Sequence, residues 1–405
     1  MDKSTSDWHP MQYYSDGKQT FGELTLGYRE KVKSFCTQTV ELWRVAISTA
    51  FVTAIAIFIL WLMFRQPATS ALSHPTQPST HEDLEQAIKI LYHPILHGYS
   101  GDFTTIEGDT FSTSTIDWNV PLGNDLCIVD IDSRPMNGSN QIWSPDDTFD
   151  WKHVKGSQSG YFNHYIYSRI HGYRYIYMQA TVPEGWAAPW ARPGVFKHLL
   201  PQCRVLLYAD SDVIIPNLRL PVEWLLNYWQ IPTNQSILAS AEDALNVPGL
   251  LPWTQPDSRG NPNNNGGFII LHNSADHVLD ALLTKWANCV SEVDYPGCAN
   301  YTKKWPAEQG ALNEFVRYDF PEYVMRLPCN EAMGWPEWQY CKGQLVRHYT
   351  VAKDQVHGAI EASLAQGLMK VVHENMVAHK SELYEFRGFV GEDDAGGRRR
   401  RGRSR

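Results

Sequence analysis

An uninterrupted apolar run near the N-terminus dominates the pattern of hydrophobic and polar positions. Residues 45–64 read VAISTAFVTAIAIFILWLMF, twenty residues without a charge, and Arg44 and Arg65 flank them. A helix of this length spans the roughly 30 Å hydrocarbon core of a bilayer. Basic side chains precede the run, whereas after Arg65 the next one is Lys89. The positive-inside rule therefore predicts a transmembrane anchor with the N-terminus in the cytoplasm and the rest of the chain in a lumen.

Beyond the anchor, short apolar runs alternate with stretches that have helical spacing. The runs predict strands over residues 125–132, 173–178, 204–208, 237–241, 267–271 and 323–327. Helices are predicted over residues 161–170, 191–200, 222–229, 276–290 and 308–316. This alternation favours an α/β fold, in which a sheet is covered by helices on both faces.

Composition changes along the chain predict the domain boundaries. The divisions are a cytoplasmic tail (1–44), the anchor (45–64), a stem and lead-in (65–118), a luminal domain (119–385) and a C-terminal tail (386–405). The stem begins with a Pro/Ser/Thr-rich stretch, 66–81, which is typical of extended linkers. The tail carries six arginines after an acidic run and is expected to be disordered.

Composition and cysteine usage narrow the function classes. The chain has 405 residues, 12% of them aromatic, which excludes disorder along its whole length. A net charge of −9 argues against a nucleic-acid binder. Six of the seven cysteines and three N-x-[ST] sequons, at Asn137, Asn234 and Asn300, follow the anchor. A lumen permits disulfides; the pairing is open, with Cys289–Cys298 and Cys329–Cys341 suggested by proximity.

The segment from Cys203 to Ile215 carries the most informative chemistry. Its apolar run delivers Asp210 and Asp212 at the C-terminal end of a predicted strand. Ligands of open α/β sheets bind beyond the carboxyl ends of the strands. Two carboxylates there can share a Mn²⁺ or Mg²⁺ ion, and such an ion can hold the diphosphate of a nucleotide-sugar. Turns and helix caps also use Asp, so the context of the pair decides between these interpretations.

Several segments in the same order resemble glycosyltransferase family 34, the group of fungal α-galactosyl- and α-mannosyltransferases and plant xyloglucan xylosyltransferases. They are 163–173 (NHYIYSRIHGY), 210–212 (DSD), 264–270 (NNGGFII), 273–274 (NS), 308–312 (EQGAL) and 348–353 (HYTVAK). They extend over nearly half of the chain. The resemblance implies a GT-A fold, which is a Rossmann-like mixed sheet flanked by helices, and makes 119–385 the catalytic domain.

The resemblance also implies roles for individual residues. Asp210 and Asp212 would bind the metal, and His348 would complete its protein ligands. Lys353 would pair with a diphosphate oxygen of the donor. A structural histidine and an ordinary surface lysine are the alternative interpretations of His348 and Lys353.

Glu308 and Gln309 would face the donor sugar or the reaction centre, as candidate catalytic residues. Their alternative is the first turn of a helix, where Glu suits the dipole without any function.

The run before the strand at 267–271 is a candidate substrate-binding segment. Asn264 or Asn265 can hydrogen-bond sugar hydroxyls, and Gly266 and Gly267 allow a sugar to approach the backbone closely. The alternative is a flexible loop, since the preceding residues are rich in Gly, Asn and Pro.

The sequence thus predicts a type II Golgi membrane glycosyltransferase that is metal-dependent and, as the resemblance implies, retaining. It would move a hexosyl or pentosyl unit from a UDP-hexose or GDP-mannose type of donor to a glycan acceptor, alone or in an oligomer with other glycosyltransferases. Two alternatives stay open. One is a non-catalytic luminal protein that binds glycans or regulates a partner. The other is a GT-A enzyme of another family, such as one that resembles glycogenin.

Overall fold

The computed structural model describes residues 81–145, 149–242, 256–334 and 341–384, all within the unit Ser79–Arg405. The predicted cytoplasmic tail, the anchor at 45–64, nearly all of the Pro/Ser/Thr-rich stretch and the tail at 386–405 lie outside the described residues. Among the residues that are described, no helix is long and apolar enough to cross a membrane. The anchor therefore stays a prediction from the sequence.

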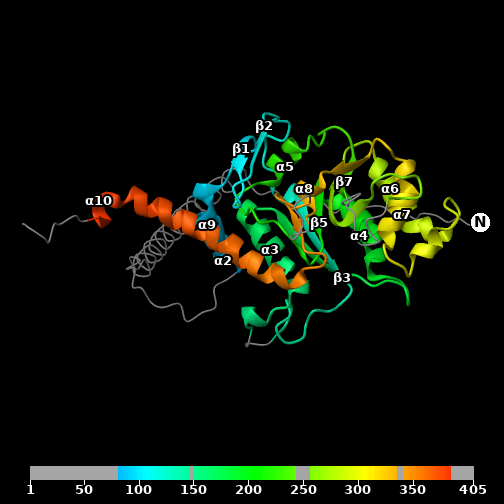
Figure 1. Ribbon diagram of the computed structural model, residues 1–405, viewed down its shortest axis with the longest axis horizontal. Helices are drawn as coiled ribbons and strands as arrows, with labels where there is room; N and C mark the ends of the chain where they lie inside the picture. The colour runs from blue at the N-terminus through cyan, green and yellow to red at the C-terminus, as the bar shows by residue number, and fades with distance from the viewer. Residues whose placement is uncertain (1–80, 146–148, 243–255, 335–340, 385–405) are drawn as a thin grey trace, which may run out of the picture. The chain divides into compact units, whose positions relative to one another are not determined.

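A six-stranded mixed sheet forms the centre of the described structure (Figure 1). Its spatial order is β4 (Arg174–Gln179), β3 (Leu126–Asp132), β5 (Val205–Ala209), β8 (Asn264–His272), β7 (Ile237–Glu242) and β9 (Val324–Leu327). Strand β3 pairs in parallel with β4 and β5, and β7 in parallel with β9, whereas β8 is antiparallel to both of its neighbours. All six strands predicted from the apolar runs are present, with ends shifted by up to three residues.

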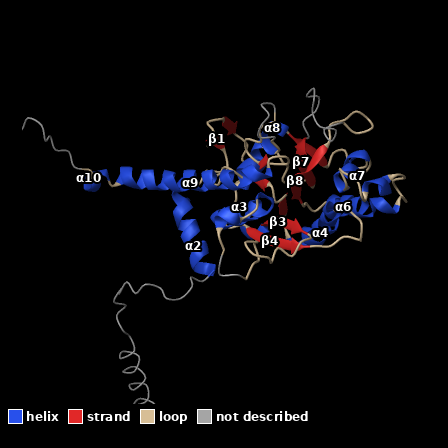
Figure 2. Ribbon diagram, turned by 60° about the horizontal axis from the view of Figure 1, so that its bottom comes forward, coloured by secondary structure: helices blue, strands red, loops and turns tan. Residues whose placement is uncertain are grey.

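Helices cover both faces of the sheet, as predicted (Figure 2). One face carries α3 (Gly156–His171), α5 (Val222–Tyr228), α2 (His81–Tyr92) and α9 (Val356–Ala378), and the other α4 (Ala191–Leu199), α6 (Val278–Asn288) and α7 (Glu308–Glu314). Alternate residues of one strand serve the two faces: Leu207 packs in the first core and Leu206 in the second. This follows from the period of two along a strand.

The smaller elements complete the body. They are the hairpin of β1 (Gly101–Thr104) and β2 (Thr110–Thr113), the ribbon of β6 (Val213–Ile214) and β10 (Arg347–His348), and the short helices α8 (Cys329–Ala332) and α10 (Lys380–Leu383). The five predicted helices are confirmed. The sequence did not predict α2, the hairpin or α9. The lead-in from residue 81 is therefore folded: Phe103 and Trp118 are buried in the first core.

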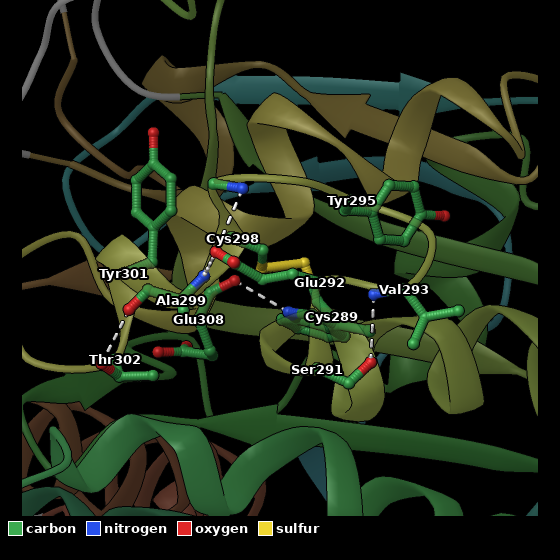
Figure 3. The surroundings of a disulfide bond; sticks show 12 residues. Cys289, Ser291, Glu292, Val293, Tyr295, Cys298, Ala299, Tyr301, Thr302 and Glu308 are labelled. Atoms are coloured by element: carbon green, nitrogen blue, oxygen red, sulfur yellow. Dashed lines mark hydrogen bonds between the residues drawn. A yellow bond between two sulfur atoms is a disulfide. The ribbon is translucent and has the colours of Figure 1, made fainter.

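Three disulfides connect six of the cysteines. The proximity pairings Cys289–Cys298 and Cys329–Cys341 are confirmed. The third bond, Cys127–Cys203, links β3 to the residues that lead into its neighbour β5. Figure 3 shows the Cys289–Cys298 bond in a tight loop close to Glu308, the first residue of α7.

Candidate active site

Two pairing interactions place Asp210, Asp212 and His348 together. Asp210 follows β5, and its backbone N–H donates to Gly267 O at 2.7 Å. After the turn, β6 pairs antiparallel with β10, with Val213 opposite His348. The buried strand β5 thus delivers the carboxylates to the edge of the sheet, and a two-residue ribbon carries in an imidazole from far along the chain.

The side chains of this triad face one another. Single ligand atoms from Asp210, Asp212 and His348 all lie within 4.8 Å of one another. The His348 Nε2 atom is 3.3 Å from Asp212 Oδ1 and 3.9 Å from Asp210 Oδ2. His348 and Asp212 are 5% and 3% exposed. The structure therefore brings together all three metal ligands that the resemblance implied.

The donor set suits a hard or borderline divalent cation. Carboxylate oxygens favour Mg²⁺ and Mn²⁺, and an imidazole nitrogen in place of a further oxygen favours Mn²⁺. Burial alone would lower the pKa of His348, but Asp212 and Asp210 outweigh burial and raise the pKa above its ordinary value. The electrostatic potential at the imidazole is therefore negative, and the same negative potential would favour a bound metal ion.

Lys353 adds a second positive charge at the rim. Its Nζ is 2.5 Å from Asp212 Oδ2, and the side chain is 52% exposed. Burial would raise the pKa of Asp212, but His348 and Lys353 lie against the carboxylate and hold its pKa well below the ordinary value. Because Lys353 is half-exposed, its ammonium can move from Asp212 to an incoming anion at little cost in packing.

A buried arginine from α4 connects the first carboxylate to Glu308. Arg192 donates to Asp210 Oδ1 at 2.5 Å, to Glu308 Oε1 at 2.6 Å and to the hydroxyl of Tyr208 at 2.9 Å. Tyr208 also donates to Asp210. Sequence reasoning missed Arg192, because α4 also carries Lys197 and His198 and nothing in its sequence distinguishes the one basic residue that is buried in the site.

Glu308 and Gln309 both reach the site from the start of α7. Glu308 is fully buried, and its Oε2 has no partner among the described residues. Burial raises the pKa of Glu308, while Arg192 opposes the rise. Gln309 accepts a bond from the backbone N–H of Gly266 at 2.7 Å, which fixes α7 against β8. The interpretation of Glu308 and Gln309 as the first turn of a helix is thus correct for the secondary structure. Glu308 also contacts the site, through its bond to Arg192.

The segment 264–267 forms the first part of β8 rather than a loop. Asn264 is 1% exposed and donates to Ser240 Oγ, and Asn265 is 4% exposed and accepts from Gly267 N. The glycines make room for side chains of the site. A Cβ on Gly266 would lie 2.9 Å from Arg192 Nη1, and one on Gly267 would lie 2.3 Å from His348 Cε1. These contacts favour a supporting role for the segment.

A cavity of about 320 Å³ opens beside the carboxylates. Asp210, Asp212 and Lys353 lie on one wall, and the carboxyl end of β3 forms another with Asp132 and Arg134. Arg134 donates to Asp132 Oδ1 at 2.9 Å and to Oδ2 at 2.6 Å, and the Tyr161 hydroxyl donates to Oδ2 at 2.7 Å. Sequence reasoning missed this wall, although Asp132 ends a predicted strand, as Asp210 nearly does.

No family model matches the chain, and no curated protein matches it. Among solved structures, it is similar to a glycosyltransferase involved in the glycosylation of the major capsid of PBCV-1, with 16% identity over 58% of this chain and 98% of that one and a TM-score of 0.38. It is also similar to an active-site mutant of LgtC, with 12% identity over 58% and 95% of the two chains and a TM-score of 0.31.

A third similar structure is the glycosyltransferase GlyE of Streptococcus pneumoniae, with 12% identity over 62% and 63% of the chains and a TM-score of 0.32. At such identities and TM-scores the likeness carries no argument about activity. The comparisons do not confirm family 34, and the function has to be argued from the site.

Proposed function

We propose that this chain is a metal-dependent glycosyltransferase that uses a nucleotide-sugar donor. The observation that carries the proposal is the convergence of Asp210, Asp212 and His348, of which the two carboxylates line a cavity at the carboxyl ends of β3 and β5. That edge of an α/β sheet is where ligands bind. A Mn²⁺ or Mg²⁺ ion there would neutralise charge on the departing diphosphate.

Other residues of this chain would bind the diphosphate or hold the metal ligands in position. Lys353 is placed to leave Asp212 and pair with a diphosphate oxygen as a point charge. Arg192 holds Asp210 in position, and its own place is fixed by Glu308 and Tyr208. With the leaving group stabilised by charge in this way, its departure needs no general acid.

The lining of the cavity would set the orientation of the bound donor. Its wall at Asp132 and Arg134 offers both an acceptor-rich carboxylate and a guanidinium, which suits the nucleoside. The part of the lining at Asp212 and Lys353 suits the diphosphate. The sugar would then lie towards Arg192, which lines the same cavity.

The finer features are part of the proposal. Retention of configuration, a UDP-hexose or GDP-mannose donor, a glycan acceptor and a place in the Golgi come from the resemblance to family 34, and the type II orientation comes from the apolar run and its flanking charges. Support for a luminal position comes from the three disulfides, which need an oxidising compartment, and from Asn137, Asn234 and Asn300, which are all exposed.

The test is turnover of a panel of nucleotide-sugars by the purified full chain, with Mn²⁺ and with EDTA. We expect hydrolysis of at least one donor in the absence of acceptor, and loss of that hydrolysis with EDTA. Asp212→Asn should lower turnover about a hundredfold, because an amide is a weaker ligand for the metal ion that would neutralise the leaving group. Asp280→Asn, which changes a 62% exposed carboxylate on α6, should leave turnover unchanged.

Other outcomes would favour the alternatives. Glycan binding without turnover of any donor, unaffected by EDTA, would identify a non-catalytic glycan-binding protein. Full activity in a folded Asp212→Asn variant would remove the metal role assigned to this carboxylate.

A further inference from the structure

The short strand β6 follows directly on the turn that carries the two carboxylates, and its two edges have different partners. Strands β6 and β10 form a two-stranded ribbon. At the edge that faces β10, the Tyr349 N–H donates to Asp212 O at 2.8 Å. Backbone groups of successive residues in an antiparallel strand point to opposite edges, so Ser211, Val213 and Ile215 face the other edge. Buried backbone groups there need partners, and no strand of the described structure supplies them.

Helix α3 supplies partners at both ends of this second edge. The Gly160 N–H donates to Ser211 O at 3.1 Å. The Asn163 side chain accepts from Ile215 N at 2.7 Å and donates to Ile215 O at 3.2 Å. A Cβ on Gly160 would lie 2.4 Å from Ser211 O, so glycine is needed for the helix to come this close. The helix thus takes the place of a neighbouring strand.

His164 bonds to the middle of the same edge. Its Nε2 is 2.9 Å from Val213 O, and its Nδ1 is 2.7 Å from Asp130 Oδ1. A carbonyl oxygen only accepts, so Nε2 carries a proton and donates it. The Tyr175 hydroxyl donates to Asp130 Oδ2 at 2.6 Å, and both His164 and Asp130 are 0% exposed. A carboxylate on β3 therefore fixes the imidazole ring from one side, and the ring donates to the main chain of β6 on the other.

Val213 connects this contact to the candidate metal site. Its N–H donates to Asp210 O at 2.8 Å, which closes the turn that carries both carboxylates. It also lies opposite His348 in the ribbon of β6 and β10. A shift of the Val213 backbone would therefore move the carboxylates and the imidazole of His348 relative to one another. A metal site loses affinity when the groups that orient its ligands are removed.

We propose that Asn163 and His164 are positioning residues for the metal site, because they hold the edge of β6 and with it the main chain that carries the metal ligands. The inference rests on the proposed function, since it concerns the metal ion of that same site. Neither residue lines the cavity beside the carboxylates. The alternative is that both residues stabilise the fold without affecting the site.

Two substitutions at His164 separate its two bonds. The amide nitrogen of Gln reaches about as far as Nε2 of His, so His164→Gln keeps a donor for Val213 O. The amide nitrogen of Asn reaches about as far as Nδ1, so His164→Asn keeps the bond to Asp130 alone. Purified full chains are titrated calorimetrically with Mn²⁺. We expect His164→Asn to weaken Mn²⁺ binding about ten- to a hundredfold and His164→Gln to stay within about threefold of wild type.

His171→Asn is the matched control, because it removes the same kind of bond from the same helix. The His171 Nε2 atom is 2.8 Å from Leu218 O, which lies outside both the turn and the ribbon. Urea unfolding measures stability in parallel. We expect both His171→Asn and His164→Asn to be less stable than wild type, since each loses a hydrogen bond, and the Mn²⁺ affinity of His171→Asn to be unchanged.

Several outcomes would overturn the inference. They are wild-type Mn²⁺ affinity in a folded His164→Asn, equal losses of affinity in His164→Asn and His164→Gln, and an equal loss in His171→Asn. If His164→Asn does not fold, Asn163→Ala is titrated in its place, because it removes both bonds to Ile215 from the same edge. A folded Asn163→Ala with wild-type affinity, or failure of both variants to fold, would give these residues a structural role alone.

Donor hydrolysis by the wild-type chain distinguishes this inference from the proposed function. Mn²⁺ binding and donor hydrolysis in wild type, with no selective loss of affinity in His164→Asn, would remove the positioning role alone. Mn²⁺ binding that is lost selectively in His164→Asn, without hydrolysis of any donor by wild type, would keep the positioning role and remove the glycosyltransferase. A wild-type chain that binds no Mn²⁺ would remove both.

Discussion

At the residue scale, the candidate site depends on close packing around Gly267. A Cβ at this position would lie 2.3 Å from His348 Cε1 and 2.5 Å from His348 Nδ1. Contacts this short require movement, and the imidazole is wedged between β8 and the two carboxylates. Glycine is therefore needed here because the neighbouring strand brings a metal ligand against the backbone.

Gly267→Ala should displace the His348 ring from the carboxylates. We expect the affinity for Mn²⁺, measured by calorimetric titration, to fall about ten- to a hundredfold, as for other changes that reorient a metal ligand. Gly194→Ala on α4 is the control. A Cβ there has nothing within 4 Å, and alanine favours the helix, so stability should rise slightly with Mn²⁺ affinity unchanged. Unchanged Mn²⁺ affinity in Gly267→Ala would contradict the placement of His348.

At the scale of secondary-structure elements, helix α5 is anchored by a buried acid, Glu223. This residue is 1% exposed, and it accepts from the Leu122 N–H at 2.6 Å and from the Tyr173 hydroxyl at 2.5 Å. Burial raises the pKa of Glu223 above its ordinary value of 4.5, and the two hydrogen bonds oppose the rise. The folded state therefore holds a proton at pH values where the unfolded chain has lost it.

The sign of the pH dependence follows from this pKa. The contribution of Glu223 to stability is fully present below pH 4.5 and is lost as the pH rises through the raised pKa. Glu223→Gln has no charge to bury, so its free energy of unfolding relative to wild type should increase from pH 4 towards neutral pH. Urea unfolding across that range measures it, with Glu322→Gln at an exposed position as the control. Parallel pH curves for wild type and Glu223→Gln would contradict the prediction.

The elements also show which parts of the structure could be predicted from the sequence. Buried strands such as β5 can be recognised in the sequence as apolar runs, because both faces of the sheet are covered. Asp210 and Asp212 follow from the end of that run. Arg192 does not, since its bond to Glu308 joins positions 116 residues apart and depends on the order of the strands. His348 came from a resemblance, because a two-residue strand leaves no periodic pattern.

At the scale of the whole molecule, two disulfides of different span act on different properties. Cys127–Cys203 joins residues 76 apart and connects two adjacent central strands, whereas Cys289–Cys298 joins residues 9 apart in a loop close to Glu308 (Figure 3). A cross-link restricts the unfolded chain more when it closes a longer loop. The first bond should therefore govern global stability, and the second should govern the local position of α7.

Replacing each cysteine pair by alanine separates these roles. Cys127→Ala/Cys203→Ala should lower the free energy of unfolding by about 4 kcal/mol in urea titrations, with donor hydrolysis below the transition largely kept. Cys289→Ala/Cys298→Ala should cost about 2 to 3 kcal/mol but reduce hydrolysis more, because Trp286, three residues before Cys289, donates to the Glu308 carbonyl at 2.7 Å. A greater loss of stability on removal of Cys289–Cys298 would contradict the argument from loop length. A greater loss of turnover on removal of Cys127–Cys203 would mean that the active site is supported from β3 rather than from the start of α7.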